Sequence, residues 1–132
     1  MSAPIPKLPI AVIGAGLAGL SCAQALLQSG HAVHVFDKSR GPSGRMSTRR
    51  AEDAAGPWQC DHGAQYFTAR DPQFRAEVAR WQQAGVAALW GARLASFDGS
   101  AWTTPATPLE RFVGTPRMTS PAGWLVQGLQ QA

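Results

Sequence analysis

Cysteine and acidic residues are both scarce in this chain of 132 residues. The two cysteines, Cys22 and Cys60, form no CxxC pair, and no histidine–cysteine pair has the spacing of a zinc site. We therefore expect no metal site and two free thiols, which suits a reducing, cytoplasmic compartment. The eight carboxylates show no pairing typical of acid–base catalysis, and no Ser/His/Asp or Cys/His arrangement stands out. We accordingly assign no catalytic side chain.

Charged residues make up only 15% of the chain and apolar residues 45%, which is a globular composition. The net charge is +4, and a basic balance favours a polyanionic partner such as nucleic acid, anionic lipid or a phosphate-bearing cofactor. Several arginines lie between Arg40 and Arg70, but no aromatic residue is interleaved within residues 40–50. This argues against a nucleic-acid interface, so we expect no nucleic-acid partner. The residues do not indicate an oligomeric state.

A long hydrophobic stretch occurs once, over residues 10–27, and its length approaches that of a signal peptide or a short membrane span. Glycines at 14, 16 and 19 break its middle, and Ser21 and Gln24 interrupt its second half. We therefore expect no membrane insertion. The preceding residues 1–7 contain two prolines and no periodicity, and we expect a frayed leader there.

The same stretch has the boundary signals of a βαβ unit. Residues 8–13 (LPIAVI) are apolar on both faces, which predicts a buried parallel strand. A glycine turn over 14–19 follows, then a helix to Gln28 with Gly30 just past its end. Residues 32–36 (AVHVF) predict the second strand.

Beyond this unit the pattern is less regular. The polar stretch 38–56 predicts a long functional loop, and residues 58–68 are expected to be partly extended. Three further elements have clear boundary signals: a helix opened by Asp71-Pro72 and ended by Gly85, a hairpin over 94–104 that turns at Asp98-Gly99, and a short helix opened by Ser120-Pro121.

The glycine turn is a G-x-G-x-x-G motif between a strand and a helix, and acidic Asp37 stands at the tip of the next strand. That context defines the dinucleotide fingerprint. The first glycine permits a tight turn, the second lets a pyrophosphate approach, and the third lets the helix pack closely. The helix N-terminus attracts phosphate, whereas Asp37 suits ribose hydroxyls and repels a 2′-phosphate, which favours FAD or NAD over NADP. The predicted cofactor-binding residues here are Gly14, Ala15, Gly16, Leu17, Ala18, Gly19 and Asp37.

Residues 37–46 (DKSRGPSGRM) resemble the second dinucleotide signature of amine-oxidase and glutathione-reductase-like flavoproteins, an acidic residue followed by a loop ending in Gly-Gly-Arg. The resemblance implies FAD as the cofactor and adds Lys38, Gly44, Arg45 and Met46 to its binding residues, with Arg45 near the pyrophosphate. Ser43 stands where the first glycine of the pair is expected, and serine tolerates a left-handed backbone less well.

Residues 61–71 (DHGAQYFTARD) look like the D-x-G-A-Q-Y-F segment of renalase-like proteins. With the two earlier motifs, the chain resembles the bacterial renalase-like branch of the FAD amine-oxidase superfamily over about residues 10–71, and more loosely over 81–132. The resemblance implies that Gln65 and Tyr66 line the isoalloxazine end of the cofactor. The alternative is a strand whose polar residues face solvent, and the sequence leaves both open.

The resemblance implies an FAD-dependent oxidoreductase with O2 as electron acceptor. Renalase-like proteins oxidise dihydronicotinamide dinucleotide isomers, the broader superfamily oxidises amines, and these residues do not choose between the two reductants. The implied fold is α/β: a Rossmann-like βαβ unit of the glutathione-reductase and amine-oxidase type. Residues 1–71 would form the FAD-binding segment, and residues 72–132 would form a small β/α extension that begins the substrate region.

We expect the sheet to be incomplete, because one βαβ unit cannot close a parallel sheet and family members are considerably longer. We therefore expect this chain alone to bind FAD weakly and to show little turnover. The alternative function is a non-catalytic, truncated dinucleotide-binding module. A coding sequence that continues past Ala132 would favour the enzyme, and a stop codon there would favour the module.

Overall fold

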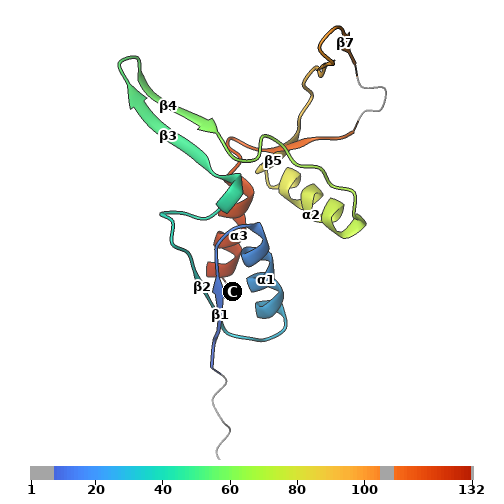
Figure 1. Ribbon diagram of the computed structural model, residues 1–132. Coiled ribbons are helices and arrows are strands. Elements are labelled where there is room, and N and C mark those ends of the chain that lie inside the picture. The colour runs from blue at the N-terminus through green and yellow to red at the C-terminus, as the bar shows by residue number, and fades with distance from the viewer. Residues whose placement is uncertain (1–7, 105–108, 132) are drawn as a thin grey trace, which may run out of the picture.

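The computed structural model describes residues 8–104 and 109–131; the leader expected over 1–7 lies outside this part. Figure 1 shows the arrangement of its helices and strands. They are β1 (Ile10–Ile13), α1 (Leu17–Gln28), β2 (Val33–Phe36), the 3-10 helix η1 (Gly44–Met46), β3 (Thr48–Asp53), β4 (Gly56–Asp61), α2 (Pro72–Gln83), β5 (Ala87–Leu89), β6 (Ser96–Phe97), β7 (Trp102–Thr103), β8 (Phe112–Gly114) and α3 (Ser120–Gln130).

The predicted βαβ unit is present. β1 and β2 pair in parallel, from Ile10 opposite Val33 to Ile13 opposite Phe36, and α1 packs against both strands. Past the end of α1, Gly30 adopts a φ of +78°. The N–H groups of Gly30 and the next residue donate to the carbonyls of Leu27 and Leu26 at 2.9 and 3.0 Å. This pairing is a Schellman motif, and it explains why a glycine is needed there.

The parallel sheet has two strands within the described residues, as predicted from its single βαβ unit. One face is covered by helices, since α1 packs against the strands and also against α3 (Figure 1). The side chains of the other face are open: Ile13 is 80% exposed and Phe36 is 53% exposed.

The prediction of a loop over residues 38–56 is wrong for the second half of this range, which contains β3. β3 pairs antiparallel with β4, from Thr48 opposite Asp61 to Asp53 opposite Gly56, and this hairpin projects from the body of the molecule (Figure 1). Most of its side chains are exposed on both faces, so β3 carries charges instead of the apolar alternation that marks a half-buried strand. Its turn is closed by the Asp53 carboxylate, which accepts from the Ala55 N–H at 2.8 Å.

The helix signal at residues 71–72 is confirmed in α2, where the Asp71 carboxylate accepts from the Phe74 N–H at 2.9 Å and proline opens the helix. The second hairpin is also confirmed, with Phe97 of β6 opposite Trp102 of β7. The antiparallel pair β5–β8 was not predicted, because each strand is only three residues long.

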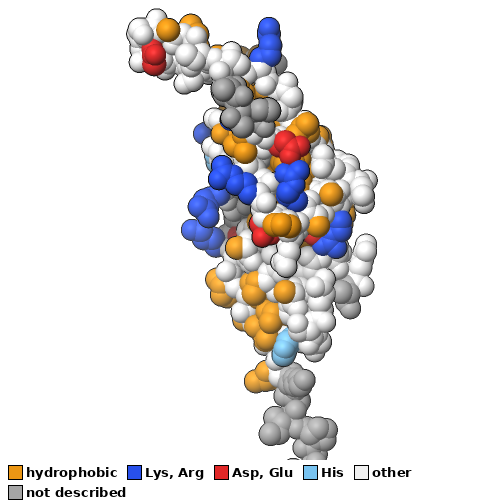
Figure 2. All heavy atoms as spheres, turned by 90° about the vertical axis from the view of Figure 1, so that its right-hand side faces the viewer, with side chains coloured by type: hydrophobic (Ala, Val, Ile, Leu, Met, Phe, Trp, Pro, Cys, Tyr) orange, Lys and Arg blue, Asp and Glu red, His pale blue; other side chains and the backbone are white. Residues whose placement is uncertain are grey.

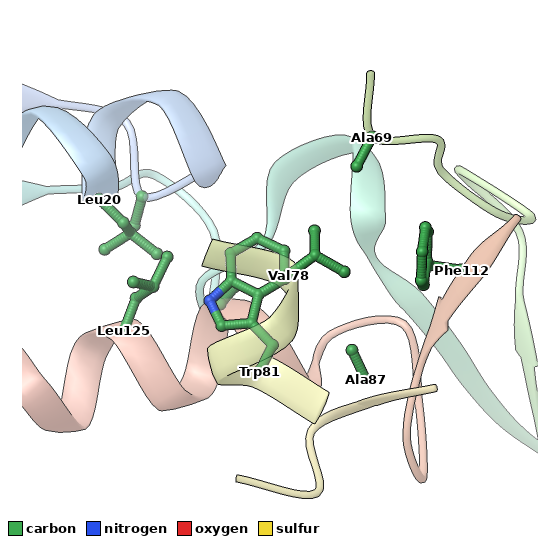
Figure 3. Close-up of a cluster of buried hydrophobic side chains, with 9 residues drawn as sticks. Leu20, Ala69, Val78, Trp81, Ala87, Phe112 and Leu125 are labelled. Atoms are coloured by element: carbon green, nitrogen blue, oxygen red, sulfur yellow. The ribbon is translucent and has the colours of Figure 1, made fainter. Parts of the chain in front are cut away.

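The hydrophobic core joins the three helices and β8. Leu20 of α1 faces Leu125 of α3, and Trp81 of α2 lies between this contact and Phe112 of β8 (Figure 3). Trp81 is 2% exposed, and its indole N–H donates to Glu77 at 2.8 Å, which satisfies its one polar atom. The core therefore takes residues from both predicted segments, 1–71 and 72–132, and the boundary between them stays a prediction.

Candidate functional site

The glycine turn between β1 and α1 depends on close backbone contact. Gly14 has a φ of +103°, and its N–H donates to the Phe36 carbonyl at 2.6 Å. A Cβ on Gly19 would lie 1.9 Å from the Gly14 carbonyl oxygen, so the first turn of α1 packs directly on the glycine turn. Gly16 caps the helix without any side-chain hydrogen bond. The amino end of α1 therefore keeps N–H groups for an anion.

Asp37 lies beside this turn, as predicted. Its Oδ2 accepts from the Ala15 N–H at 2.6 Å, and its Oδ1 accepts from the Ser39 N–H at 2.7 Å and contacts the Ser39 hydroxyl. Hydrogen bonds to the carboxylate lower the pKa of Asp37 to about 2. The largest cause is the hydrogen bond from the Ser39 hydroxyl, followed by those from the Ala15 and Ser39 N–H groups. The carboxylate at the end of β2 is therefore ionised at neutral pH.

The loop before η1 lies against the glycine turn. The Ser43 N–H donates to the Ala15 carbonyl at 2.9 Å, and Ser43 and Gly16 form an isolated parallel bridge. Ser43 has a φ of +123°, so the position at which a glycine was expected from the Gly-Gly-Arg signature has a left-handed backbone here. Its hydroxyl is buried and has no hydrogen-bond partner among the described residues. A Cβ on Gly44 would lie 3.4 Å from the Gly16 Cα, so little space separates the two motifs.

The third motif contacts the second. The Ala64 N–H donates to the Arg45 carbonyl at 2.8 Å, and a Cβ on Gly63 would lie 2.0 Å from the same oxygen. The Ser47 hydroxyl and the His62 Nε2 are 3.2 Å apart. The three motifs are separate in the sequence, and the fold brings them into one continuous arrangement.

Two grooves meet at this arrangement. The first has a volume of about 900 Å3 and is lined by Gly14, Asp37 and Lys38 together with Arg40 and Arg50. The second has a volume of about 940 Å3, and its lining includes Gly16, Leu17, Ala18, Arg45, Met46 and the segment 62–64. Both grooves are bordered by Ser43, Gly44 and Ser47. Three cations and one carboxylate line the first groove, which favours an anionic ligand.

Sequence reasoning missed part of the first groove. Arg50 of β3 and Thr119 and Gly123 of the α3 region line it, although they are distant in the sequence. No local signal marks them, because their position depends on the β3–β4 hairpin and on the packing of α3 against α1.

Gln65 and Tyr66 line neither of these two grooves, although they directly follow segment 62–64. Both are exposed, and the Tyr66 ring stacks on Trp90 with 5.7 Å between ring centroids. Whether they line the cofactor or face solvent therefore stays a prediction.

The structure describes residues 8–104 and 109–131, and the following absences refer to these ranges. No group of three potential metal-ligating side chains occurs in them. No helix in this part combines the length and hydrophobicity that crossing a bilayer needs. Cys22 and Cys60 are free thiols, and both are exposed.

Comparison with known proteins gives related sequences that are much longer. Zeta-carotene desaturase from Arabidopsis thaliana is 46% identical over 43 residues, which is 33% of this chain and 8% of that protein. D-amino acid dehydrogenase 2 from Ralstonia nicotianae is 33% identical over 76 residues, which is 52% of this chain and 18% of that protein. A solved structure of putrescine oxidase bound to putrescine aligns with 77% of this chain and 22% of its own, at 22% identity and a TM-score of 0.47. The chain thus spans less than a quarter of each.

A family match covers more of the chain. Residues 12–81 match the model described as an NAD(P)-binding Rossmann-like domain, which is more than half of the sequence. The match includes the glycine turn, Asp37 and the loop through Arg45, and such a domain fits a dinucleotide cofactor. The chain therefore belongs to the NAD(P)-binding Rossmann-like domain family.

Proposed function

We propose that this chain is the cofactor-holding part of a flavin-dependent oxidoreductase and that its dinucleotide is FAD. The observation that supports this best is the ionised Asp37 carboxylate, 2.6 Å from the Ala15 N–H beside the amino end of α1. A sugar-binding carboxylate next to a phosphate-binding helix end matches the two parts of an adenosine diphosphate. A 2′-phosphate would meet the negative charge of Asp37, which disfavours NADP.

The arrangement fits the diphosphate of FAD. Gly16 and Gly44 both line the second groove, and Gly16 presents no Cβ there, so a phosphate in the groove can approach its backbone. Arg45 is exposed and lines the second groove, and its planar guanidinium suits paired phosphate oxygens. Met46 is buried and anchors η1, which fixes the backbone around Arg45.

Bound FAD would supply an isoalloxazine ring that accepts a hydride. The residues of this chain bind and orient it: the segment 14–19 with Asp37 and Lys38 at the adenosine end, Gly44 to Met46 at the diphosphate, and Gln65 and Tyr66 toward the ring. The names of the relatives, a desaturase and a dehydrogenase, support redox chemistry. A dihydronicotinamide dinucleotide or an amine as reductant, O2 as acceptor and a cytoplasmic location complete the proposal. Its segments are residues 1–71 for the cofactor and 72–132 for the beginning of the substrate region.

The test is a calorimetric titration of the purified chain with ADP, with 5′-AMP and with 2′,5′-ADP. Even weak affinities suffice, since the comparison is between ligands and variants. We expect 5′-AMP, which differs from 2′,5′-ADP only by lacking the 2′-phosphate, to bind more tightly than 2′,5′-ADP. We expect Arg45→Gln to weaken ADP binding about tenfold, the size of one charged hydrogen bond. Arg93→Gln removes another exposed charge, one that lines neither groove, and should leave the ADP affinity unchanged.

Three results would contradict the proposal: no ADP binding, tighter binding of 2′,5′-ADP than of 5′-AMP, or equal ADP affinity of the Arg45→Gln and wild-type chains. Flavin absorbance of the chain after addition of FAD tests the flavin itself. ADP binding without any FAD binding would favour a dinucleotide-binding module that carries out no flavin chemistry. Stoichiometric FAD with peroxide production would instead overturn the expectation that the chain alone has little turnover.

A further inference from the structure

A serine and a histidine face each other at the open end of the β3–β4 hairpin. The two strands are paired up to Thr48 opposite Asp61. Ser47 precedes β3 and His62 follows β4, so they lie opposite each other one step further along. Opposite residues of a hairpin share one face, and their side chains meet there. The Ser47 hydroxyl and the His62 Nε2 are accordingly 3.2 Å apart, and we call these two residues the Ser47–His62 pair.

Backbone hydrogen bonds fix both members of the pair. The Ser47 N–H donates to the Gly44 carbonyl at 3.1 Å, where η1 ends. On the other side, the Ala64 N–H donates to the Arg45 carbonyl at 2.8 Å, which holds the segment that carries His62 against η1. The two side chains therefore extend from backbone segments that are already joined, which is the preorganisation that a binding site needs.

The pair lines the groove that also contains Arg45. Ser47 and His62 both line the second groove beside the amino end of α1, and Ser47 borders the first groove as well. Ser47 is partly buried and His62 is exposed, so the imidazole is accessible from the groove. A diphosphate that lies against Arg45 and the amino end of α1 is therefore within the groove that the pair lines.

The second groove has basic groups and no acidic one. Among the described residues that line it, Arg45 is the charged side chain besides the imidazole, and no carboxylate occurs. Asp61 precedes His62 in the chain, but its carboxylate accepts from the Met118 N–H at 3.3 Å and contacts the Thr48 hydroxyl. The surroundings of the imidazole thus favour an anionic ligand.

The adjoining first groove has the same balance of charge, with three cations and one carboxylate, Asp37, along it. Figure 2 shows that Lys and Arg side chains outnumber acidic ones over the middle of the face it presents. Because the pKa of Asp37 is about 2, this carboxylate keeps its charge throughout the range, about pH 5 to 8, in which histidine ordinarily changes its own. Among the residues that line the two grooves, His62 is therefore the one whose charge can change in that range.

Protonation changes what the pair can donate. A neutral imidazole keeps one nitrogen as an acceptor, and the Ser47 hydroxyl can donate to it. In the protonated imidazole both nitrogens carry hydrogen, so Nε2–H donates to the Ser47 oxygen and the hydroxyl hydrogen becomes free for a phosphate. Protonation also adds a positive charge near Arg45, and a bound diphosphate offsets the repulsion between the two cations. Anion binding should therefore strengthen as the pH falls from about 8 to about 5.

We propose that the Ser47–His62 pair is a second phosphate-binding element of this groove and binds the diphosphate of a dinucleotide when His62 is protonated. This inference rests on the proposed function, because it takes the ligand of the groove to be a dinucleotide. His62 supplies the charge, and Ser47 positions the imidazole and donates its hydroxyl hydrogen to a phosphate oxygen. The site formed by Arg45 and the helix end thereby gains a dependence on pH.

The probe for the test is ADP-ribose, because both of its phosphates are diesters and lack the ionisation near pH 6 of a terminal phosphate. It is titrated into the chain by calorimetry at about pH 5.5 and about pH 8 and at one ionic strength. We expect wild type to bind about fivefold more tightly at the lower pH, near the upper limit for one exposed charged contact. His62→Gln should bind equally at both pH values. His31→Gln, which removes an exposed histidine that lines neither groove, should keep the whole gain.

Two more variants separate the charge from the hydroxyl. His62→Lys is charged at both pH values and should bind at about pH 8 as tightly as wild type binds at about pH 5.5. Loss of folding cannot produce such a gain. Ser47→Ala keeps the imidazole but removes its partner, and its gain at the lower pH should fall to about twofold. The circular dichroism of every variant is compared with wild type at both pH values.

The inference is overturned if wild type binds equally at both pH values, if His62→Gln keeps the gain, or if Ser47→Ala keeps all of it. ADP-ribose binding without a gain that depends on His62 refutes this inference alone. A His62-dependent gain in a chain that binds no FAD, measured by flavin absorbance, refutes the proposed function alone. Absence of ADP-ribose binding at both pH values refutes both.

Discussion

Replacing Gly19 with alanine should separate the packing of α1 from its helix propensity. The added Cβ would lie 1.9 Å from the Gly14 carbonyl oxygen, and real Cβ atoms essentially never approach within 3.0 Å. The obstacle is backbone, which cannot rotate away as a side chain can, so α1 must move off the glycine turn. Overpacking of this kind costs about 1–3 kcal/mol, and alanine regains about 1 kcal/mol of helix propensity. We expect a net loss of about 1 kcal/mol, and at most about 2 kcal/mol, in the free energy of unfolding.

Gly128→Ala in α3 is the matched control. This glycine is exposed inside a helix of similar length, and a Cβ there meets nothing within 4 Å. Its substitution should raise the free energy of unfolding by up to about 1 kcal/mol. Urea unfolding followed by circular dichroism measures both variants, and ADP titration of Gly19→Ala should show weaker binding because the turn is displaced. A Gly19→Ala chain as stable as wild type, or equal losses in both variants, would refute the reasoning.

Two further predictions concern Ser43 and Asp37. Ser43→Gly should raise the free energy of unfolding by about 1–2 kcal/mol, because it relieves a φ of +123° and removes a buried hydroxyl without a partner. The control is Ser21→Gly on the exposed side of α1, which should lower the free energy of unfolding by about 0.5 kcal/mol. If Ser43→Gly is less stable than wild type, the Ser43 backbone is not strained. For Asp37, the pKa falls from 3.8 to about 2 on folding, so its stabilisation is present above about pH 4 and is lost as pH falls toward 2. The urea midpoints of wild type and Asp37→Asn should therefore converge as the pH falls from about 4 toward 2. A difference that stays constant over this pH range would contradict the lowered pKa of Asp37.

The βαβ unit was predictable because its signals are local. Gly14, Gly16 and Gly19 mark the turn, Gly30 marks the end of α1, and an apolar strand lies on either side. Asp71 likewise predicted the start of α2 through its capping hydrogen bond. These signals depend on φ, capping and periodicity, which a single sequence contains.

The remaining elements depend on contacts between distant residues. β3 is a strand only because β4 pairs with it, and its exposed faces leave no apolar pattern to detect. Asp61 at the end of β4 accepts from the Met118 N–H at 3.3 Å and contacts Thr48, which connects the hairpin to the region before α3. This contact helps to bring Thr119 toward the first groove, and no feature of the sequence near Thr119 indicates it.

The packing of α1 on α3 also determines the order in which this protein can fold. Leu20 is buried in a core cluster with residues of a helix that begins at Ser120, so α1 can complete this packing only after α3 has been synthesised. Closing so long a stretch of chain slows folding, since its entropy is lost before the contact forms. During translation the glycine turn between β1 and α1 therefore leaves the ribosome well before residues near Leu125, and until then α1 has no α3 to pack against.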